Sequence, residues 1–410
     1  MLVSIITIGD ELLIGQTIDT NAAWIGQQLS QLGCTIKSKY TCSDVATDII
    51  NTLQQATLQA DLIIITGGLG PTKDDITKHT LAQFFNQNLI IHTPTLDRLT
   101  AYFEASKRSF SASLKSIALQ PDASIVLANT QGLAPGILIE NDSKRYVCLP
   151  GVPAEMKAIF TESFLPVFQP TLTVESAYVT LMTAGVGESV LADKIKHIEE
   201  TMPEHVTIAY LPDYGIVRLR ITATGATAAA DATHYANSIK AVVGSCCYAD
   251  IQIELAAFIG QLLTQKKLTL GIAESCSGGY VSHLITSQPN CSFYFNGAIV
   301  CYSNAQKMKH LGVAHKTLET HGAVSEATVS EMLNGALQAL DCNVAIAISG
   351  IAGPGGGSIE KPVGTIVIGV GTSERQCIKV LSLARDRKRN IQWSSMLLLN
   401  ELRLFVTEYL

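Results

Sequence analysis

The stretch GIAESCSGGY, residues 271–280, places Ser275 after an apolar run and ahead of two glycines. A serine at the end of a strand can act as a nucleophile, but only if a neighbouring base removes its proton. The familiar base is histidine, and His283 lies eight residues further on. Helical geometry would put His283 about two turns away, so we expect a surface or core histidine there. The stretch alone also fits a flexible turn.

Lys307 is the other candidate base, as in hydrolases that use a Ser-Lys pair. It follows the apolar segment FNGAIVCY, and SNAQ, residues 303–306, fits a helix capping box. Lys307 then falls near the end of the first helical turn, where the helix dipole and burial both disfavour an ammonium. Both effects favour the neutral amine that a general base requires. Because lysines near helix starts are usually solvated, the spacing alone does not establish this role.

Two glycine-rich segments can offer backbone N–H groups to an oxyanion or a phosphate. One follows Ser275, and the other is SGIAGPGGG, residues 349–357, after another apolar run. Tyr302 and Asn304 are close enough in sequence to orient Lys307 or a ribose, whereas the basic neighbours of Arg387 make a phosphate contact and a solvated face equally consistent. The candidate substrate-binding residues of this site are Gly278, Gly279, Tyr302, Asn304, Gly350, Gly353, Gly355 and Arg387.

A second glycine-rich turn, TGGLGPTKDD at residues 66–75, lies between an apolar strand and an expected helix. Glycines let the backbone approach a ligand, and a helix start offers free N–H groups to phosphate. Asp74 and Asp75 suit an anion only if a cation such as Mg²⁺ bridges them to it. The turn or the acid pair alone is typical of an ordinary strand-to-helix connection. Together they favour a site for a nucleotide phosphate.

Strands alternate with amphipathic helices over residues 1–170, which predicts a doubly wound α/β domain. We expect one helix from Asn21 towards Leu32, capped by Asp19 or Thr20. Another helix is expected to follow the second glycine turn, with Asp75 suited to its first turn.

The remaining residues predict two further domains. Residues 171–248 have the pattern of a small α+β unit, with a helix that begins near Glu188. Residues 249–410 predict a second α/β domain, whose first helix runs from Ile251 to about Gln265. In that domain the helix after the nucleophile is expected to begin near Ser277.

The composition excludes several classes of protein. A length of 410 residues with 47% hydrophobic and 16% charged residues is typical of a globular protein of two or three domains. The net charge of −6, with no long basic run, argues against nucleic-acid binding. No apolar stretch approaches the roughly 18 residues of a membrane span. The ten scattered cysteines, with no CxxC and no basic leader, predict free thiols in the cytoplasm.

Several motifs resemble one family along nearly the whole chain. GDELLIGQTIDTN, GGLGPTKDDITK and LPGVPAEMK resemble the molybdopterin-binding-like domain of the CinA family. AESCSGG, YSNAQK, SGIAGPGGG and KPVGT resemble that family's nicotinamide mononucleotide (NMN) deamidase domain. The resemblance implies a hydrolase of pyridine nucleotide salvage that converts NMN to nicotinic acid mononucleotide and ammonia. It also implies ADP-ribose pyrophosphatase activity in the N-terminal domain and a KH-like fold for the middle unit.

The resemblance also assigns residues. Ser275 matches the deamidase nucleophile and Lys307 its base, with no cofactor needed. In the N-terminal domain the resemblance assigns Gly67, Gly68, Gly70, Asp75 and Asp44 to a ligand site. With Thr72 and Asp74 of the same turn, the candidate substrate-binding residues are Gly67, Gly68, Gly70 and Thr72, and the candidate metal positions, for Mg, Mn or Co, are Asp44, Asp74 and Asp75. Family members often carry a second acid where this chain has Val45. Glu11 fits either a further contact or a solvated loop acid.

The expected partners are small nucleotides, NMN and ADP-ribose, and a second copy of the chain in a homodimer, without membrane or nucleic acid. Two other functions stay open. The first is a molybdopterin-handling enzyme with an accessory last domain. The second is a non-catalytic partner protein of competence or DNA-damage responses, with the middle unit as its interaction module.

Overall fold

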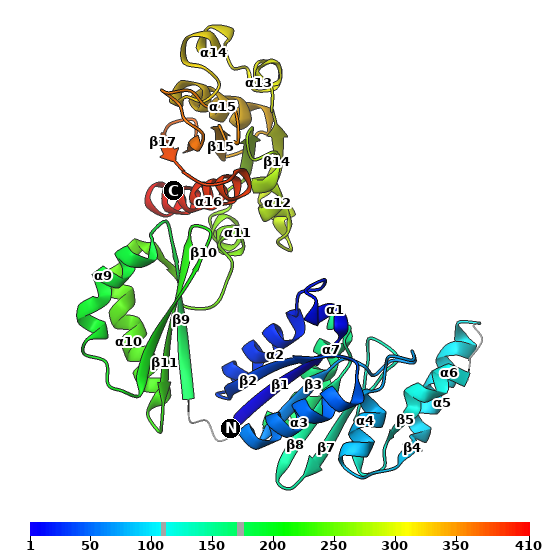
Figure 1. The fold of residues 1–410 in the computed structure, drawn as a ribbon. Helices are drawn as coiled ribbons and strands as arrows, with labels where there is room; N and C mark the ends of the chain where they lie inside the picture. The colour runs from blue at the N-terminus through cyan, green and yellow to red at the C-terminus, as the bar shows by residue number, and fades with distance from the viewer. Residues whose placement is uncertain (108–111, 170–175) are drawn as a thin grey trace. The chain divides into compact units, whose positions relative to one another are not determined.

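The computed structural model describes residues 1–107, 112–169 and 176–410. It divides into two compact units, Met1–Ala177 and Tyr178–Leu410, called here the N-terminal and C-terminal units (Figure 1). Among the described residues, no helix combines the length and the apolar character needed to cross a membrane. All ten cysteines are free thiols.

The N-terminal unit is built on a six-stranded sheet with the order β2-β1-β3-β8-β7-β6. The strands β2, β1, β3 and β8 are parallel, and β7 is antiparallel to both of its neighbours, β8 and β6. Every residue of β3 is buried, because helices cover both faces of the sheet. The strands are β1 (Leu2–Ile8), β2 (Thr35–Cys42), β3 (Leu62–Thr66), β6 (Ser124–Leu127), β7 (Gly136–Asn141) and β8 (Lys144–Leu149).

Figure 1 shows helices on the two faces of this sheet, which confirms the doubly wound prediction. One face packs against α2 (Thr20–Gln31), α7 (Pro153–Ala158), η2 (Ile159–Phe164) and α8 (Leu165–Phe168), and the other against α3 (Ala46–Gln59), α4 (Thr77–Phe84) and α5 (Thr93–Ala105). Smaller elements are α1 (Asp10–Leu13), α6 (Ala112–Lys115), η1 (Ser116–Ala118) and the paired strands β4 (Leu89–Ile91) and β5 (Leu119–Pro121).

The sequence predicted where two helices of this unit begin, and one of these two predictions is correct. Asp19 caps α2, because its side chain accepts a hydrogen bond from the backbone N–H of Ala22 at 2.8 Å. The expectation that Asp75 lies in the first turn of a helix is wrong, since α4 begins at Thr77. The Asp75 carboxylate instead accepts from the backbone N–H of Thr72, which folds residues 72–75 into a separate turn.

The C-terminal unit begins with a four-stranded sheet of order β10-β11-β9-β12. Its strands β9 (Ser176–Ala184), β10 (Val206–Asp213), β11 (Ile216–Thr224) and β12 (Cys247–Ala249) are accompanied by α9 (Glu188–Glu199), α10 (Ala228–Val243) and η4 (Gly244–Cys246). The start of α9 at Glu188 confirms the sequence prediction. Alternate residues of β11 are buried, as expected for a sheet with one face packed against helices.

The rest of this unit is a five-stranded sheet of order β14-β13-β15-β16-β17. The strands β13 (Leu270–Glu274), β14 (Phe295–Val300) and β15 (Val344–Gly350) are parallel. The strand β16 (Thr365–Gly371) is antiparallel to both of its neighbours, β15 and β17 (Gln376–Ser382). One face packs against α11 (Leu255–Lys266), α12 (Tyr280–Thr286) and α16 (Arg387–Tyr409), and the other against α13 (Asn304–Leu311), α14 (His315–His321) and α15 (Glu326–Ala339). A short turn, η5 (Cys291–Phe293), precedes β14.

For two helices that pack against this sheet, the predicted first residue is wrong. The helix after Ser275 begins at Tyr280 and not near Ser277, because Gly278 and Gly279 have φ values of +62° and +99°, outside the right-handed helical region. The first helix begins at Leu255 and not at Ile251.

Candidate functional site

Ser275 and Lys307 meet at the carboxyl edge of the C-terminal sheet. Ser275 directly follows β13. Lys307 is the fourth residue of α13, the helix that follows the neighbouring strand β14. Lys307 Nζ lies 2.9 Å from Ser275 Oγ, and both residues are buried. Ser303 caps α13 as predicted, because its hydroxyl accepts from the backbone N–H of Gln306. His283 is exposed on α12, as expected for a surface histidine.

The surroundings of Lys307 favour its neutral form. The Nζ atom also donates to the backbone carbonyls of Cys301 at 3.0 Å and Tyr302 at 3.3 Å. Those two acceptors can take both hydrogens of a neutral amine, which leaves its lone pair for the Ser275 hydroxyl proton. Burial lowers the pKa of Lys307 below its ordinary value, although the thiols of Cys301 and Cys276 act in the opposite direction.

Glu274 is a buried residue of this site that the sequence did not single out. Its side chain is fully buried, and its carboxylate accepts hydrogen bonds from the backbone N–H groups of Gly279, Val281 and Ser282 at 2.8–3.1 Å. The hydroxyls of Ser277 and Ser282 also donate to it. The carboxylate therefore caps α12 internally and holds the turn that carries Ser275.

This capping decides which backbone donors remain near Ser275. Among the described residues, the N–H groups of Cys276 and Ser277 have no hydrogen-bond partner, whereas those at the start of α12 are occupied by Glu274. The N–H groups of Gly353, Gly355, Gly356 and Gly357 also lack partners in the described part of the chain. Two separate sets of donors are thus free, one beside the nucleophile and one in the loop after β15.

Arg387 connects the loop after β15 to the short segment between β14 and α13. Its Nη1 donates to the Gly353 carbonyl at 2.7 Å, and its Nη2 donates to the Tyr302 hydroxyl at 3.0 Å. Arg387 is exposed at the first turn of α16, so its remaining N–H groups face solvent. Asn304, the first residue of α13, is exposed. Gly350 ends β15 where a Cβ would lie 2.6 Å from Ile366.

The second candidate site is a pocket of about 450 Å³ in the N-terminal unit. It lies at the carboxyl ends of the parallel strands, where ligands bind in open α/β sheets. The sequence-predicted residues that line it are Glu11, Asp44, Gly67, Gly68, Gly70, Asp74 and Asp75. Thr72 does not line the pocket, and its backbone and hydroxyl donate instead to the Asp75 carboxylate.

The glycine turn of this pocket leaves backbone donors free. Gly67 and Gly68 have φ values of +109° and +67°, and a Cβ on them would lie 2.4 Å from the Ile8 carbonyl and 2.1 Å from the Thr77 hydroxyl. Among the described residues, the N–H groups of Gly68, Leu69 and Gly70 have no hydrogen-bond partner. Three adjacent N–H groups of this kind suit a phosphate.

Carboxylates gather beside these donors. Burial raises the pKa of Asp44, and the negative charges of Asp10, Glu11 and Asp74 raise it further. Such a set of oxygen donors suits a hard divalent cation, which would relieve the repulsion. No three His, Cys, Asp or Glu side chains of the described residues lie close enough together to hold a metal ion by themselves. A cation here would therefore need further oxygens, such as those of a phosphate.

Two more residues of this region were not singled out from the sequence. Glu155 lines the pocket, and its carboxylate accepts a hydrogen bond from Asn129 at 2.6 Å. Lys78 is 3% exposed and donates to the carbonyls of Ser116 and Ile117, the latter a pocket residue. Burial lowers the pKa of Lys78 to about 8. Neither role has a local sequence signal, because both depend on partners more than 25 residues away.

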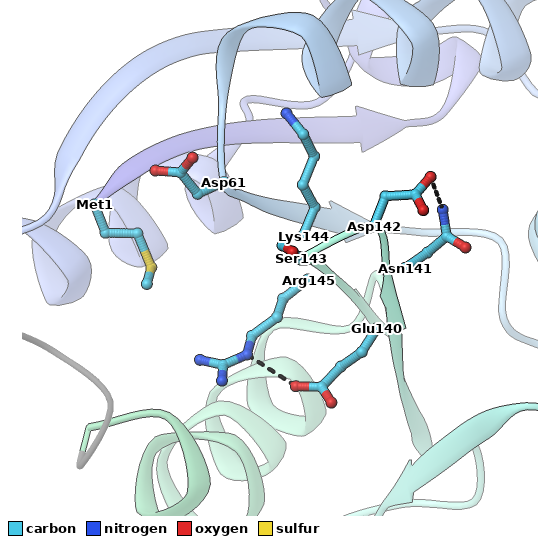
Figure 2. A pocket seen from close by; sticks show the side chains of 8 residues that line it. All are labelled: Met1, Asp61, Glu140, Asn141, Asp142, Ser143, Lys144 and Arg145. Atoms are coloured by element: carbon cyan, nitrogen blue, oxygen red, sulfur yellow. Dashed lines mark hydrogen bonds and ion pairs between the residues drawn. The ribbon is translucent and has the colours of Figure 1, made fainter.

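Another cavity of about 430 Å³ lies at the amino ends of the same strands. Figure 2 shows that its lining includes Asp61, Lys144 and Arg145. The charges there are engaged locally, since Arg145 pairs with Glu140 at 2.9 Å and Lys144 donates to the backbone carbonyl of Ala60 at 2.9 Å. None of the predicted site residues lines this cavity, and it lies at the strand end opposite to that used for ligands in such sheets.

Three family models match consecutive parts of the chain. Residues 4–170 match "Probable molybdopterin binding domain", residues 179–249 match "Damage-inducible protein CinA KH domain", and residues 252–406 match "CinA C-terminal domain". These matches and the observed sheets confirm the predicted fold class, with two α/β domains and a small KH-like unit between them in sequence.

Similar proteins cover the chain almost completely. A CinA-like protein of Chloroherpeton thalassium is 40% identical over 98% of this chain and 99% of its own length. A CinA-like protein of Cytophaga hutchinsonii is 38% identical over 97% of this chain and 96% of its own length. The crystal structure of CinA from Thermoplasma acidophilum is 30% identical and covers 41% of this chain and 96% of its own, with a TM-score of 0.37. This chain belongs to the CinA family.

Proposed function

We propose that the C-terminal unit deamidates NMN, with Ser275 as nucleophile and Lys307 as general base. The observation that supports this most is the contact of 2.9 Å between Lys307 Nζ and Ser275 Oγ, made by a buried lysine. No carboxylate forms an ion pair with Lys307 among the described residues, so its burial is not offset by an opposite charge. A buried lysine without an acidic partner fits the role of general base in a Ser-Lys hydrolase better than a role in a structural ion pair.

The proposed reaction has two stages. Ser275 Oγ attacks the carboxamide carbon of NMN while Lys307 takes the hydroxyl proton. The oxyanion formed is stabilised by the free N–H groups of Cys276 and Ser277. The C–N bond then breaks, Lys307 returns the proton to the leaving nitrogen, and ammonia departs. In the second stage water, deprotonated by Lys307, attacks the Ser275 ester. The ester C–O bond then breaks, Lys307 returns the proton to Ser275 Oγ, and nicotinic acid mononucleotide is released.

The chemistry of NMN fits the remaining groups. Its pyridinium ring withdraws electrons from the carboxamide, which makes the carbonyl easier to attack. Its 5′-phosphate suits the free N–H groups of Gly353 and Gly355–Gly357 together with the exposed guanidinium of Arg387. The amides at the start of α12 cannot serve the phosphate, because the Glu274 carboxylate already occupies them.

The test is ammonia release from NMN by the purified full-length chain, with EDTA present and no partner protein. We expect turnover in wild type and a loss of about 10² or more in kcat for Lys307→Ala and for Ser275→Ala. Lys309→Ala, which changes an exposed lysine of the same helix, and Ser287→Ala, which changes an exposed serine after α12, are the matched controls. Wild type without turnover would favour the non-catalytic partner protein or the molybdopterin-handling enzyme.

For the N-terminal unit we propose a metal-dependent pyrophosphatase that hydrolyses ADP-ribose. The pocket that combines the free N–H groups of Gly68, Leu69 and Gly70 with Asp44 and Asp74 supports this second activity. A bound divalent cation would supply charge neutralisation for the pyrophosphate, held by the carboxylates and by the substrate's own oxygens. Release of AMP from ADP-ribose with Mg²⁺, Mn²⁺ or Co²⁺, and none with EDTA, is the expected result. If no metal supports release, this unit is a binding module.

A further inference from the structure

Asn390 is a buried amide in the first turn of α16. Its side chain is fully buried, and its Nδ2 donates to the backbone carbonyls of Ala352 at 3.0 Å and Arg385 at 2.9 Å. Because a carbonyl can only accept, these two contacts settle which end of the amide carries the hydrogens. Asn390 therefore fastens the loop after β15 to the segment that leads into α16.

The other end of this amide is unpaired. The Oδ1 atom of Asn390 is buried and accepts no hydrogen bond from any described residue. A buried acceptor without a donor costs free energy, so the oxygen does not stabilise the fold. The amide is therefore explained by the two carbonyls that its nitrogen holds.

The bond to Ala352 also sets the direction of a free backbone donor. The Ala352 carbonyl and the Gly353 N–H belong to one trans peptide unit, which is planar, so the two groups point in opposite directions. The Gly353 N–H has no hydrogen-bond partner among the described residues. A hydrogen bond to the carbonyl fixes this plane and polarises the N–H at its other side.

The neighbouring anchor of this loop does not act on that peptide unit. Arg387 bonds to the Gly353 carbonyl at 2.7 Å, but this carbonyl belongs to the next peptide unit, whose nitrogen is that of Pro354 and carries no hydrogen. Within the described part of the chain, Asn390 is the only side chain that bonds to the Ala352–Gly353 peptide unit.

The start of α16 is held firmly enough to carry this contact. The Asp386 side chain caps the helix by accepting from the backbone N–H of Arg389 at 3.0 Å. The Arg385 guanidinium lies 3.9 Å from the centre of the Trp393 ring, a cation–π contact within the same segment. Asn390 thus joins the loop to a part of the chain that is fixed by other bonds.

We infer that Asn390 is a positioning residue of the deamidase site, which directs the Gly353 N–H towards the 5′-phosphate of the substrate. This inference rests on the proposed deamidation of NMN and identifies how its phosphate-binding loop is held. Asn390 acts through the Ala352–Gly353 peptide unit and does not touch the substrate. Recognition of the phosphate then depends on Asn390, whereas recognition of the ring and the ribose does not.

The test is calorimetric titration of the full-length chain, with EDTA present, by two ligands that differ only in the phosphate. One is nicotinic acid mononucleotide, and the other is nicotinic acid riboside. We expect wild type to bind the mononucleotide at least tenfold more tightly, the scale of one hydrogen bond to a charged group. Asn390→Ala is expected to lower this preference about fivefold, by weakening the mononucleotide and not the riboside. During turnover of NMN the same variant is expected to raise KM more than it lowers kcat.

Three further variants separate positioning from structure. Arg387→Ala removes the other phosphate contact, so it is expected to lower the preference too and reports that binding occurs at this site. Asn296→Ala is the matched control, because Asn296 Nδ2 also bridges two backbone carbonyls, those of Leu340 and Asp341, at the amino end of β14. Asn390→Ser keeps one donor, so its preference is expected to lie between those of wild type and Asn390→Ala, and it replaces the alanine variant if that variant does not fold.

The inference is overturned if wild type binds both ligands equally or binds neither. It is also overturned if Asn390→Ala weakens both ligands alike, which is the result of a purely structural role, or leaves the preference unchanged. A preference that depends on Asn390 in a chain that releases no ammonia from NMN would remove the proposed deamidation and keep Asn390 as the residue that positions the phosphate-binding loop.

Discussion

Replacement of Glu274 by glutamine tests how the nucleophile turn is held. A carboxylate offers acceptors on both oxygens, whereas a glutamine side chain places an NH₂ group on one side. Whichever way it turns, at least one buried backbone N–H, that of Ser282 or those of Gly279 and Val281, faces this NH₂ group. An unsatisfied buried donor costs about 1–3 kcal/mol, and the remaining bonds lose their charge, so we expect a loss of about 3 kcal/mol.

The assay is scanning calorimetry of the full-length chain, followed through the transition of the C-terminal unit. A loss of about 3 kcal/mol corresponds to a Tm lower by roughly 6–12 °C for a unit of this size. Glu254→Gln is the matched control, because Glu254 is exposed and accepts from a single side chain, Gln288. A Glu274→Gln transition within about 1 °C of wild type would refute the claim that this carboxylate holds the turn.

Three further outcomes are expected. Because burial lowers the pKa of Lys307, we expect kcat/KM for NMN to rise as the pH rises through that lowered pKa. Lys307→Arg is expected to lose most of kcat, since a guanidinium keeps its proton. A flat pH profile or an active arginine variant would show that Lys307 is not the general base. Asp75→Ala is expected to abolish metal-dependent ADP-ribose hydrolysis while deamidation in the same sample stays within about twofold, and loss of both activities would contradict separate sites. Burial lowers the pKa of Lys78 from 10.5 to about 8, so between these pH values the unfolded chain binds more protons than the folded chain. The free energy of unfolding of wild type, relative to that of Lys78→Met, is therefore expected to rise with pH in urea titrations. A difference that stays constant with pH would show that the pKa of this lysine is not lowered.

The structure explains the contact between Ser275 and Lys307, because both residues follow apolar segments that form neighbouring parallel strands. Carboxyl ends of such strands meet at one edge of a sheet, and here Glu274 pairs in register with Val300. The gathering of Asp44, Asp74 and the glycine turn in one pocket follows the same rule. Local sequence patterns predicted most of the elements that carry these residues, whereas the pairing of Ser275 with Lys307 was predicted from the resemblance to the CinA family.

What the sequence did not reveal depends on the geometry of turns and on distant partners. Glu274 caps α12 only because two left-handed glycines delay the start of the helix to Tyr280 and turn its N–H groups back towards the strand end. Asn390 holds the carbonyl of Ala352, a residue 38 positions away. No local pattern distinguishes either residue from an ordinary acid or a polar residue in the first turn of a helix.

The central claim is that Ser275 forms a covalent intermediate with NMN after Lys307 removes its proton. The most direct measurement is product partitioning when hydroxylamine is added to the full-length chain during NMN turnover. An ester at Ser275 is open to attack by hydroxylamine as well as by water, so we expect a hydroxamate of the mononucleotide that increases with hydroxylamine concentration at the expense of nicotinic acid mononucleotide. Ser275→Ala is expected to form neither product. Ammonia release with no hydroxamate at any hydroxylamine concentration, or hydroxamate formed equally by Ser275→Ala, would contradict the account.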